Sequence, residues 1–126
     1  MRKQYHFRPS SNGLCAWDVD RLIELTKAIE PNFVLVSAIK ELDENFWFGG
    51  QGDIPTCRAI AEHAKLIKET DLAYPIILCS NGGVMDGMHR VCRAFMEGRD
   101  KIKAVQFTVD PEPDYVDIQS PDDLPY

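Results

Sequence analysis

The sequence predicts a single domain of mixed α/β class. Three segments repeat apolar residues with the period of an amphipathic helix, and four short segments rich in β-branched residues are typical of strands. With 126 residues, of which 44% are hydrophobic, the chain can bury one core without a metal or a disulfide. No internal repeat or flexible linker divides it. The expected order is helix, strand, loop, helix, strand, strand, helix, strand.

The first helix is predicted over residues 18–30. Asp18 is placed to cap its N-terminus, and Pro31 ends it. Apolar or weakly polar side chains recur at helical spacing at Val19, Leu22, Ile23, Thr26 and Ile29. Residues 32–39 are short and rich in β-branched and aromatic side chains, which predicts the first strand.

A second helix is predicted over residues 56–69, with Asp53 or Thr56 as its cap. Its expected apolar face consists of Cys57, Ile60, Ala64 and Ile67. His63 lies beside this face and is expected to be a packed or solvated histidine rather than a ligand. A buried strand over 75–79, an Asn81-Gly82 turn and a short strand over 84–85 follow.

The third helix is predicted from Met88 to residue 97, with Gly98 as its C-terminal cap. Alternating apolar residues over 102–109 predict the last strand. Residues 110–126 contain four prolines and are expected to be extended. The sequence therefore divides into a domain over 1–109 and an acidic, proline-rich tail over 110–126.

Charge is distributed unevenly along the chain. The formal net charge is −6, but residues 110–126 hold six of the 20 acidic side chains and no Lys or Arg. Residues 1–109 therefore carry 14 acidic and 14 basic side chains and are formally neutral. Such a balance indicates no basic footprint for duplex DNA.

The spacing of the cysteines and the lengths of the hydrophobic runs indicate whether to expect metal sites, disulfides or membrane segments. The four cysteines form no C-x-x-C pair and the three histidines are scattered, so no zinc site or disulfide framework is predicted. The sequence shows neither a secretory leader nor a membrane span. We therefore expect a cytoplasmic protein with reduced thiols and no membrane partner.

The start of the third helix carries an unusual charge. His89 and Arg90 lie in its first turn, where the helix dipole disfavours cations. A phosphate bound beside Gly87 would make both favourable, because it would accept the free N–H groups and pair with the cations. The other interpretation is structural: Arg90 pairs with Asp86 or another carboxylate, and His89 caps a neighbour. Both stay open on these residues alone.

The loop over residues 40–53 is rich in acidic and aromatic side chains that can take part in catalysis or binding. It offers three carboxylates, Glu41, Asp43 and Glu44, which either form a solvated loop or serve a reaction. Trp47, between Phe46 and Phe48, either stacks on a base or belongs to the core.

The stretch "MDGMHRVCRA" resembles the D-G-H-H-R type signature of the ParB/sulfiredoxin superfamily, and the likeness extends over residues 34–107. The resemblance implies a single compact domain with a small mixed sheet and three main helices. It also implies a nucleotide, ATP, ADP or CTP with Mg²⁺, whose phosphate is held at the helix start. The matching positions are Asp86, Gly87, Met88, His89 and Arg90.

Departures from the family narrow this expectation. Met88 stands where sulfiredoxin has its catalytic cysteine, which argues against sulfiredoxin chemistry. An acidic, proline-rich tail stands where ParB continues into its helix-turn-helix domain, which argues against chromosome partitioning. The free serine kinases of the superfamily have two histidines before the arginine, and Met88 replaces the first.

The leading hypothesis is a nucleotide- or phosphate-binding ParB-like domain, with ATP- or ADP-dependent phosphotransfer to a small hydroxyl substrate as its specific form. The related kinases place an acid shortly after the first core strand, which points first to Glu41 and then to Asp43 or Glu44 as the base. We expect this loop to face the phosphate site across one cleft. The acceptor, a small molecule or a protein, is not identified. A non-catalytic nucleotide-sensing or interaction module is the alternative, and a ParB-like nuclease a third.

We predict that the protein does not bind a defined DNA duplex specifically at about 150 mM salt, because neutralising several phosphates requires clustered Lys and Arg. A gel-shift assay with specific and unrelated competitor DNA checks this. Retardation that only the matching competitor relieves would contradict it.

Overall fold

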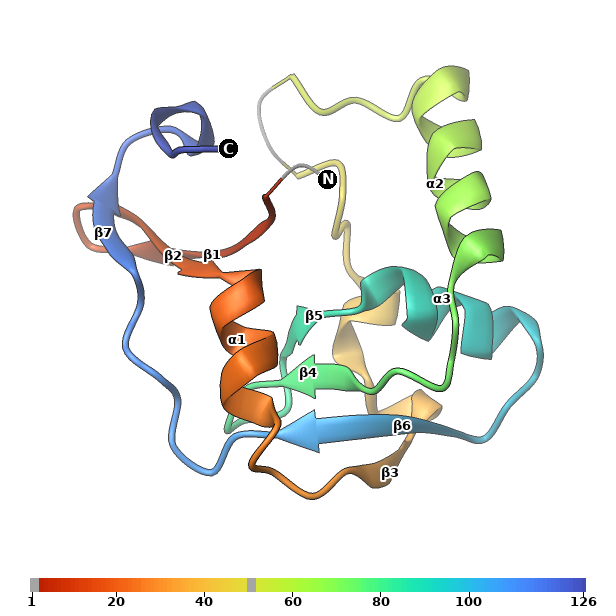
Figure 1. Ribbon diagram of the computed structural model, residues 1–126. Helices are drawn as coiled ribbons and strands as arrows, with labels where there is room; N and C mark the ends of the chain where they lie inside the picture. The colour runs from red at the N-terminus through yellow and green to blue at the C-terminus, as the bar shows by residue number, and fades with distance from the viewer. Residues whose placement is uncertain (1–2, 50–51) are drawn as a thin grey trace.

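Two small β-sheets organise the fold, and a computed structural model describes residues 3–49 and 52–126 of it (Figure 1). One sheet has three strands in the order β1-β2-β7, and the other has four in the order β3-β6-β4-β5. Three helices accompany them. The predicted mixed class with three main helices is confirmed, although the strands form two sheets rather than one.

The four-stranded sheet contains the four strands that the sequence predicts. β4 runs parallel to β6, whereas β3 and β5 pair antiparallel to their neighbours, so the sheet is mixed. Its strands are β3 (Asn32–Leu35), β4 (Ile76–Leu78), β5 (Val84–Asp86) and β6 (Lys101–Gln106). The first is shorter than expected, because after Leu35 the chain turns into two 3₁₀ segments, Val36–Ala38 and Lys40–Asp43.

The helices are α1 (Val19–Thr26), α2 (Cys57–Glu69) and α3 (Met88–Met96). Asp18 caps α1 by accepting a hydrogen bond from the N–H of Asp20, and Thr56 caps α2 through the N–H of Ala59. Of the two caps considered for α2, Thr56 is therefore the one used. Within residues 3–49 and 52–126, no helix has the length and apolar character needed to cross a membrane.

The buried face of α2 differs from the predicted one. Cys57, Ile60 and Ala64 are exposed, and the half-buried positions are Ala59, His63 and Ile67. α2 packs against α3, and on this side His63 lies within hydrogen-bond distance of His89 of α3. Of the four predicted positions, Ile67 is the one that is half-buried.

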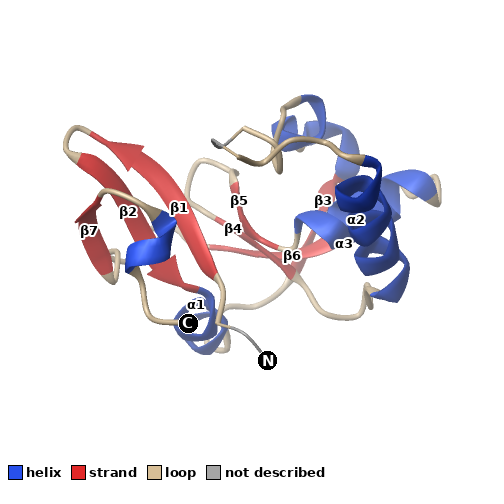
Figure 2. Ribbon diagram, turned by 90° about the horizontal axis from the view of Figure 1, so that it is seen from above, coloured by secondary structure: helices blue, strands red, loops and turns tan. Residues whose placement is uncertain are grey.

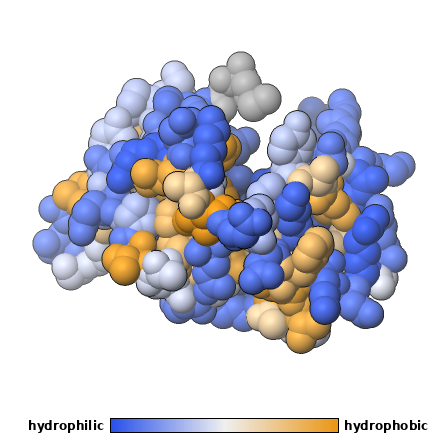
Figure 3. Space-filling view, turned by 60° about the horizontal axis from the view of Figure 1, so that its bottom comes forward, coloured by the Kyte–Doolittle hydropathy of each residue, from blue (hydrophilic) through white to orange (hydrophobic). Residues whose placement is uncertain are grey.

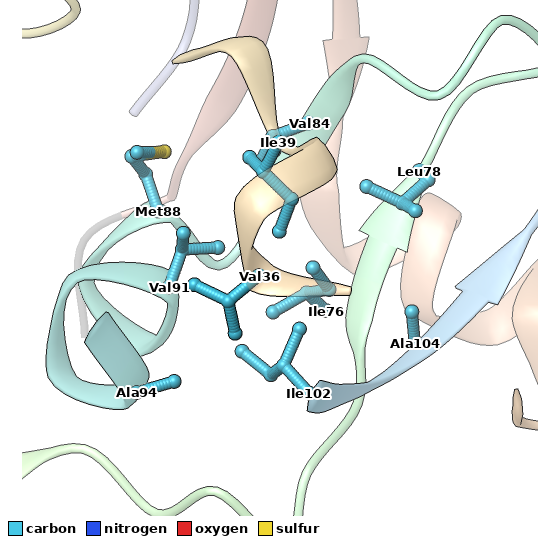
Figure 4. Packing of buried hydrophobic residues seen from close by; sticks show 10 residues of the cluster. All are labelled: Val36, Ile39, Ile76, Leu78, Val84, Met88, Val91, Ala94, Ile102 and Ala104. Carbon is cyan, nitrogen blue, oxygen red and sulfur yellow. The ribbon is translucent and has the colours of Figure 1, made fainter. Parts of the chain in front are cut away.

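Core side chains pack on both faces of the four-stranded sheet. Seen from above, α1 and α3 lie at different sides of this sheet (Figure 2). On one face, Ile76 and Leu78 of β4 pack with Val91 of α3 and with Val36 and Ile39 (Figure 4). On the other face, Ile77 packs with Leu22 of α1. This alternation follows from the two-residue period of a strand, and it makes β4 apolar throughout.

The three-stranded sheet was not predicted. It consists of β1 (Tyr5–Ser10), β2 (Gly13–Asp18) and β7 (Tyr115–Ile118). β7 comes from the predicted tail and pairs antiparallel with β2. The indole N–H of Trp17 also donates to the carbonyl of Pro111 at 2.8 Å. Residues 110–126 are therefore built into the fold, and within them residues 121–123 form a 3₁₀ turn rather than extended chain.

One edge strand of the four-stranded sheet is β3, at the bottom of Figure 1. It exposes Phe33 (65%) and Leu35 (50%). With this underside brought forward, hydrophobic side chains appear in separate patches among hydrophilic ones (Figure 3).

We predict that Leu22→Ala lowers the free energy of unfolding by about 2–5 kcal/mol, because Leu22 is fully buried and its loss leaves a cavity. The neighbouring Ile23→Ala is the matched control and costs less, since Ile23 is 44% exposed. Urea denaturation of both variants measures the difference. Equal losses would mean that α1 does not cover the sheet as described.

Candidate functional site

The N-terminus of α3 opens into a cleft of about 620 Å³. Residues 3–7 in and before β1 form one wall, β5 and the start of α3 form the other, and Phe46 and Trp47 also line the cleft. Of the predicted site residues, Asp86, Gly87, Met88 and His89 line this cleft. Arg90 is not among its lining residues.

Gly87 joins β5 to α3 in a conformation that favours glycine. Its φ is 105°, and a Cβ atom there would lie 2.7 Å from Cγ2 of Ile76. As the N-cap residue it has no side chain, so no side-chain hydrogen bond caps α3. The first-turn N–H groups are thus left for water or a ligand.

Arg90 is engaged within the protein. Its Nη2 atom pairs with Oδ2 of Asp86 at 2.9 Å, and its Nη1 atom donates to the carbonyls of Tyr74 and Pro75, each at 3.1 Å. Both ion-pair side chains are 17% exposed. The structural interpretation of Arg90 is the one observed, and its guanidinium is not offered to a ligand as a free cation.

His89 is uncharged at neutral pH. Burial, together with the nearby His63, lowers its pKa from 6.5 to about 4. Its Nε2 atom lies 2.8 Å from Nδ1 of His63 on α2, within hydrogen-bond distance. The first turn of α3 therefore contains a paired arginine and a neutral histidine. Neither places an uncompensated positive charge at the positive end of the helix dipole.

Trp47 lies across both histidines. Its ring stacks on His63 with centroids 4.3 Å apart and on His89 at 4.5 Å, with interplanar angles of 22° and 17°. Phe48 meets His63 edge-on at 5.5 Å. Trp47 thus packs against the core, which is one of its two predicted roles, and also lines the cleft. Stacking on a base stays a prediction.

The three acids of the 40–53 loop are not brought to the cleft. Glu41 is 7% exposed, and its Oε2 atom accepts a hydrogen bond from the N–H of Val84 at 2.9 Å. Its Oε1 atom is buried without a hydrogen-bond partner among the described residues. Glu41 therefore supports β5 and is not among the residues that line the cleft, where the expected base would lie.

Asp43 and Glu44 are exposed, and Asp43 borders a different hollow beside Leu35 and Phe95. The loop faces the cleft as expected, but through Phe46 and Trp47 rather than through its carboxylates. Residues 50 and 51 of this loop lie outside the described residues.

Other polar groups complete the cleft. Lys3 pairs with Asp18 at 2.8 Å, and this hydrogen bond raises its pKa. Burial, reinforced by Arg8, lowers the pKa of His6 to about 4. Asp86 is the carboxylate among the described cleft residues, and Arg90 engages only its Oδ2 atom. At neutral pH the cleft thus offers neutral imidazoles, backbone N–H groups, the carboxylate of Asp86 and the ammonium of Lys3, which is paired with Asp18.

A resident metal held by protein side chains alone is not evident: the described residues contain no group of three or more His, Cys, Asp or Glu suited to one ion. Mg²⁺ makes a lesser demand, since it binds through one or two carboxylates together with substrate phosphates. Asp86 meets this demand.

We predict that Arg90→Ala lowers the free energy of unfolding by about 1–3 kcal/mol, because it leaves the partly buried Asp86 and two carbonyls without their donor. Arg58→Ala, at an exposed position of α2, is the control and has little effect. Thermal and urea unfolding measure both. Unchanged stability in Arg90→Ala would show that the guanidinium is not structural.

We predict that the free energy of unfolding falls as the pH drops from about 6.5 towards 4. His89 titrates near 6.5 when unfolded and near 4 when folded, so protons bind the unfolded chain first and favour it. His89→Phe should flatten this part of the profile relative to the natural chain. An identical pH slope in both proteins, measured by urea denaturation at several pH values, would rule out the lowered pKa.

His63 is a packed histidine, one of the two environments that the sequence predicted for it, but its partners were not predicted. No local motif marks it, because its partners Trp47 and His89 lie 16 and 26 positions away in the chain.

Comparison with known proteins identifies no family: no family model, curated protein or solved structure matches this chain.

Proposed function

We propose that this chain is a nucleotide-binding domain of the ParB/sulfiredoxin type, and that the cleft at the start of α3 holds the phosphates of the nucleotide. One observation carries the proposal. The first turn of α3 has no side-chain cap, and its N–H groups lie at a cleft of about 620 Å³. A helix N-terminus that opens on a cleft provides aligned donors and a positive dipole end for an anion.

The size and lining of the cleft support the same ligand class. Its volume is within the range of small-molecule sites. Phe46 and Trp47 add aromatic surface beside the phosphate position, and the D-G-x-H-R stretch at its wall is the one that resembles the superfamily. ATP, ADP and CTP are the candidate nucleotides.

Binding by this site would depend on neutral donors. Arg90 is committed to Asp86, and Lys3 is committed to Asp18. The backbone N–H groups and the side chain of His89 would therefore carry the contacts to phosphate. This departs from the expectation that Arg90 itself contacts the anion.

Phosphoryl transfer, if the domain performs it, would rely on Asp86. Transfer needs a carboxylate that accepts or orients the acceptor hydroxyl at about 2.6–3.2 Å, and the loop acids lie away from the cleft. When bound, Mg²⁺ would neutralise developing charge on the phosphates. Asp86 would hold the ion or orient the hydroxyl, while Arg90 keeps its Oδ2 atom fixed.

A non-catalytic nucleotide-sensing module is the second candidate. It is favoured by the ion pair itself, because Arg90 occupies Oδ2 of Asp86 at 2.9 Å and leaves only Oδ1 to contact an acceptor hydroxyl. In this role the domain would bind a nucleotide without turnover and pass the bound state to a partner.

We predict that ADP, ATP or CTP with Mg²⁺ shifts the backbone amide signals of Met88, His89 and Arg90. Asp86→Asn should abolish the Mg²⁺ dependence and any transfer to an added hydroxyl acceptor. The matched control is Asp43→Asn, which removes the same charge outside the cleft. NMR titration measures binding, and release of ADP from ATP measures turnover.

The outcomes separate the candidates. Shifts at these three amides with turnover support the phosphotransferase. Shifts without turnover support the sensing module. Millimolar nucleotide that leaves all three signals unmoved would overturn the proposed function.

A further inference from the structure

The contact between His63 and His89 links α2 to the wall of the cleft. Nδ1 of His63 and Nε2 of His89 are 2.8 Å apart, which is a hydrogen-bond distance. His89 lines the cleft, whereas His63 borders a separate hollow with Trp47, Phe48 and Thr56. Any effect of His63 on a ligand in the cleft is therefore exerted through His89.

We propose that His63 is a positioning residue: its Nδ1–H donates to Nε2 of His89, which places the single ring proton of His89 on Nδ1 and makes this neutral histidine a hydrogen-bond donor to bound phosphate. The inference rests on the proposed function, because it specifies how the same cleft treats an anion.

The chemistry of imidazole supports this direction of the hydrogen bond. A neutral imidazole has one N–H donor and one nitrogen acceptor, so the partner of one nitrogen decides the state of the other. If His63 donates, Nδ1 of His89 carries the proton and favours a phosphate oxygen. If His63 accepts, Nδ1 of His89 presents a lone pair, which repels an anion. Phosphate binding and donation by His63 are thus thermodynamically linked.

Stacking fixes the orientation of both rings. Trp47 lies nearly parallel to each imidazole, and the imidazole centroids are 5.1 Å apart at 20° to each other. Rotation of His89 would break the hydrogen bond and the stack together. The donor is therefore held in place before a ligand arrives, which reduces the entropy lost on binding.

Nitrogen-15 NMR of the histidine side chains tests the tautomer in the ligand-free protein. We expect the N–H of His63 and the N–H of His89 both on Nδ1. His63→Leu replaces the imidazole by an apolar side chain that has no N–H donor. In this variant His89 should show a mixture of tautomers. His63→Asn should restore the natural state, because the Asn amide N–H takes the place of Nδ1–H. Glu62→Gln, at an exposed neighbouring position, is the matched control and changes nothing.

The same variants are then titrated with inorganic phosphate and with ADP. His63→Leu should weaken binding about tenfold, or about 1.4 kcal/mol, and His63→Asn should recover most of it. Amide spectra confirm that each variant is folded.

Two failures are distinguishable. If the proton of ligand-free His89 lies on Nε2, or lies on Nδ1 equally in His63→Leu, then His63 does not position it, whatever the cleft binds. If His89 has the expected tautomer but neither phosphate nor ADP binds the natural chain, the positioning contact stands and the phosphate site is overturned.

Discussion

The guanidinium of Arg90 fixes the geometry on which the cleft depends. It joins three places at once: the end of β5 through Asp86, the first turn of α3 where it resides, and the entry to β4 through the carbonyls of Tyr74 and Pro75. Gly87 sits inside this cross-link with a positive φ and packs against Ile76. The strand-to-helix joint therefore has little freedom, and its unused N–H groups are held at the cleft.

Much of the fold was accessible from the sequence because the signals were local. The caps Asp18 and Thr56, the helix starting at Met88 and the apolar strand around Ile77 all follow from residues within a few positions of one another. The hairpin of β1 and β2 was not predicted, because β1 contains an arginine and a proline and its apolar and polar residues do not alternate regularly. β7 was not predicted, because its partner strand β2 lies about a hundred residues earlier in the chain.

The site was predictable only in part, for a related reason. The sequence located the helix start, but it could not show whether Arg90 faces a ligand or a carboxylate, since both satisfy the same charge argument. The sequence indicated Glu41 as a candidate base because it is one of three acids in the 40–53 loop. Only the fold shows that it accepts a hydrogen bond from the N–H of Val84 on the edge strand β5. The grouping of Trp47, His63 and His89 arises from three separate segments and has no counterpart in any local pattern.

The pairing of β2 with β7 has a consequence for how the molecule assembles. The segments that support the β1 wall of the cleft come from opposite ends of the described chain, as the contacts of Trp17 with Pro111 and of Arg8 with Asp110 show. Closing so long a loop is entropically costly, and contacts between distant segments slow folding. The four-stranded sheet, with nearer partners in β4 and β5, can condense first. A newly made chain would then possess the helix terminus before it possesses a complete cleft, so the cleft would be completed in the last step of folding.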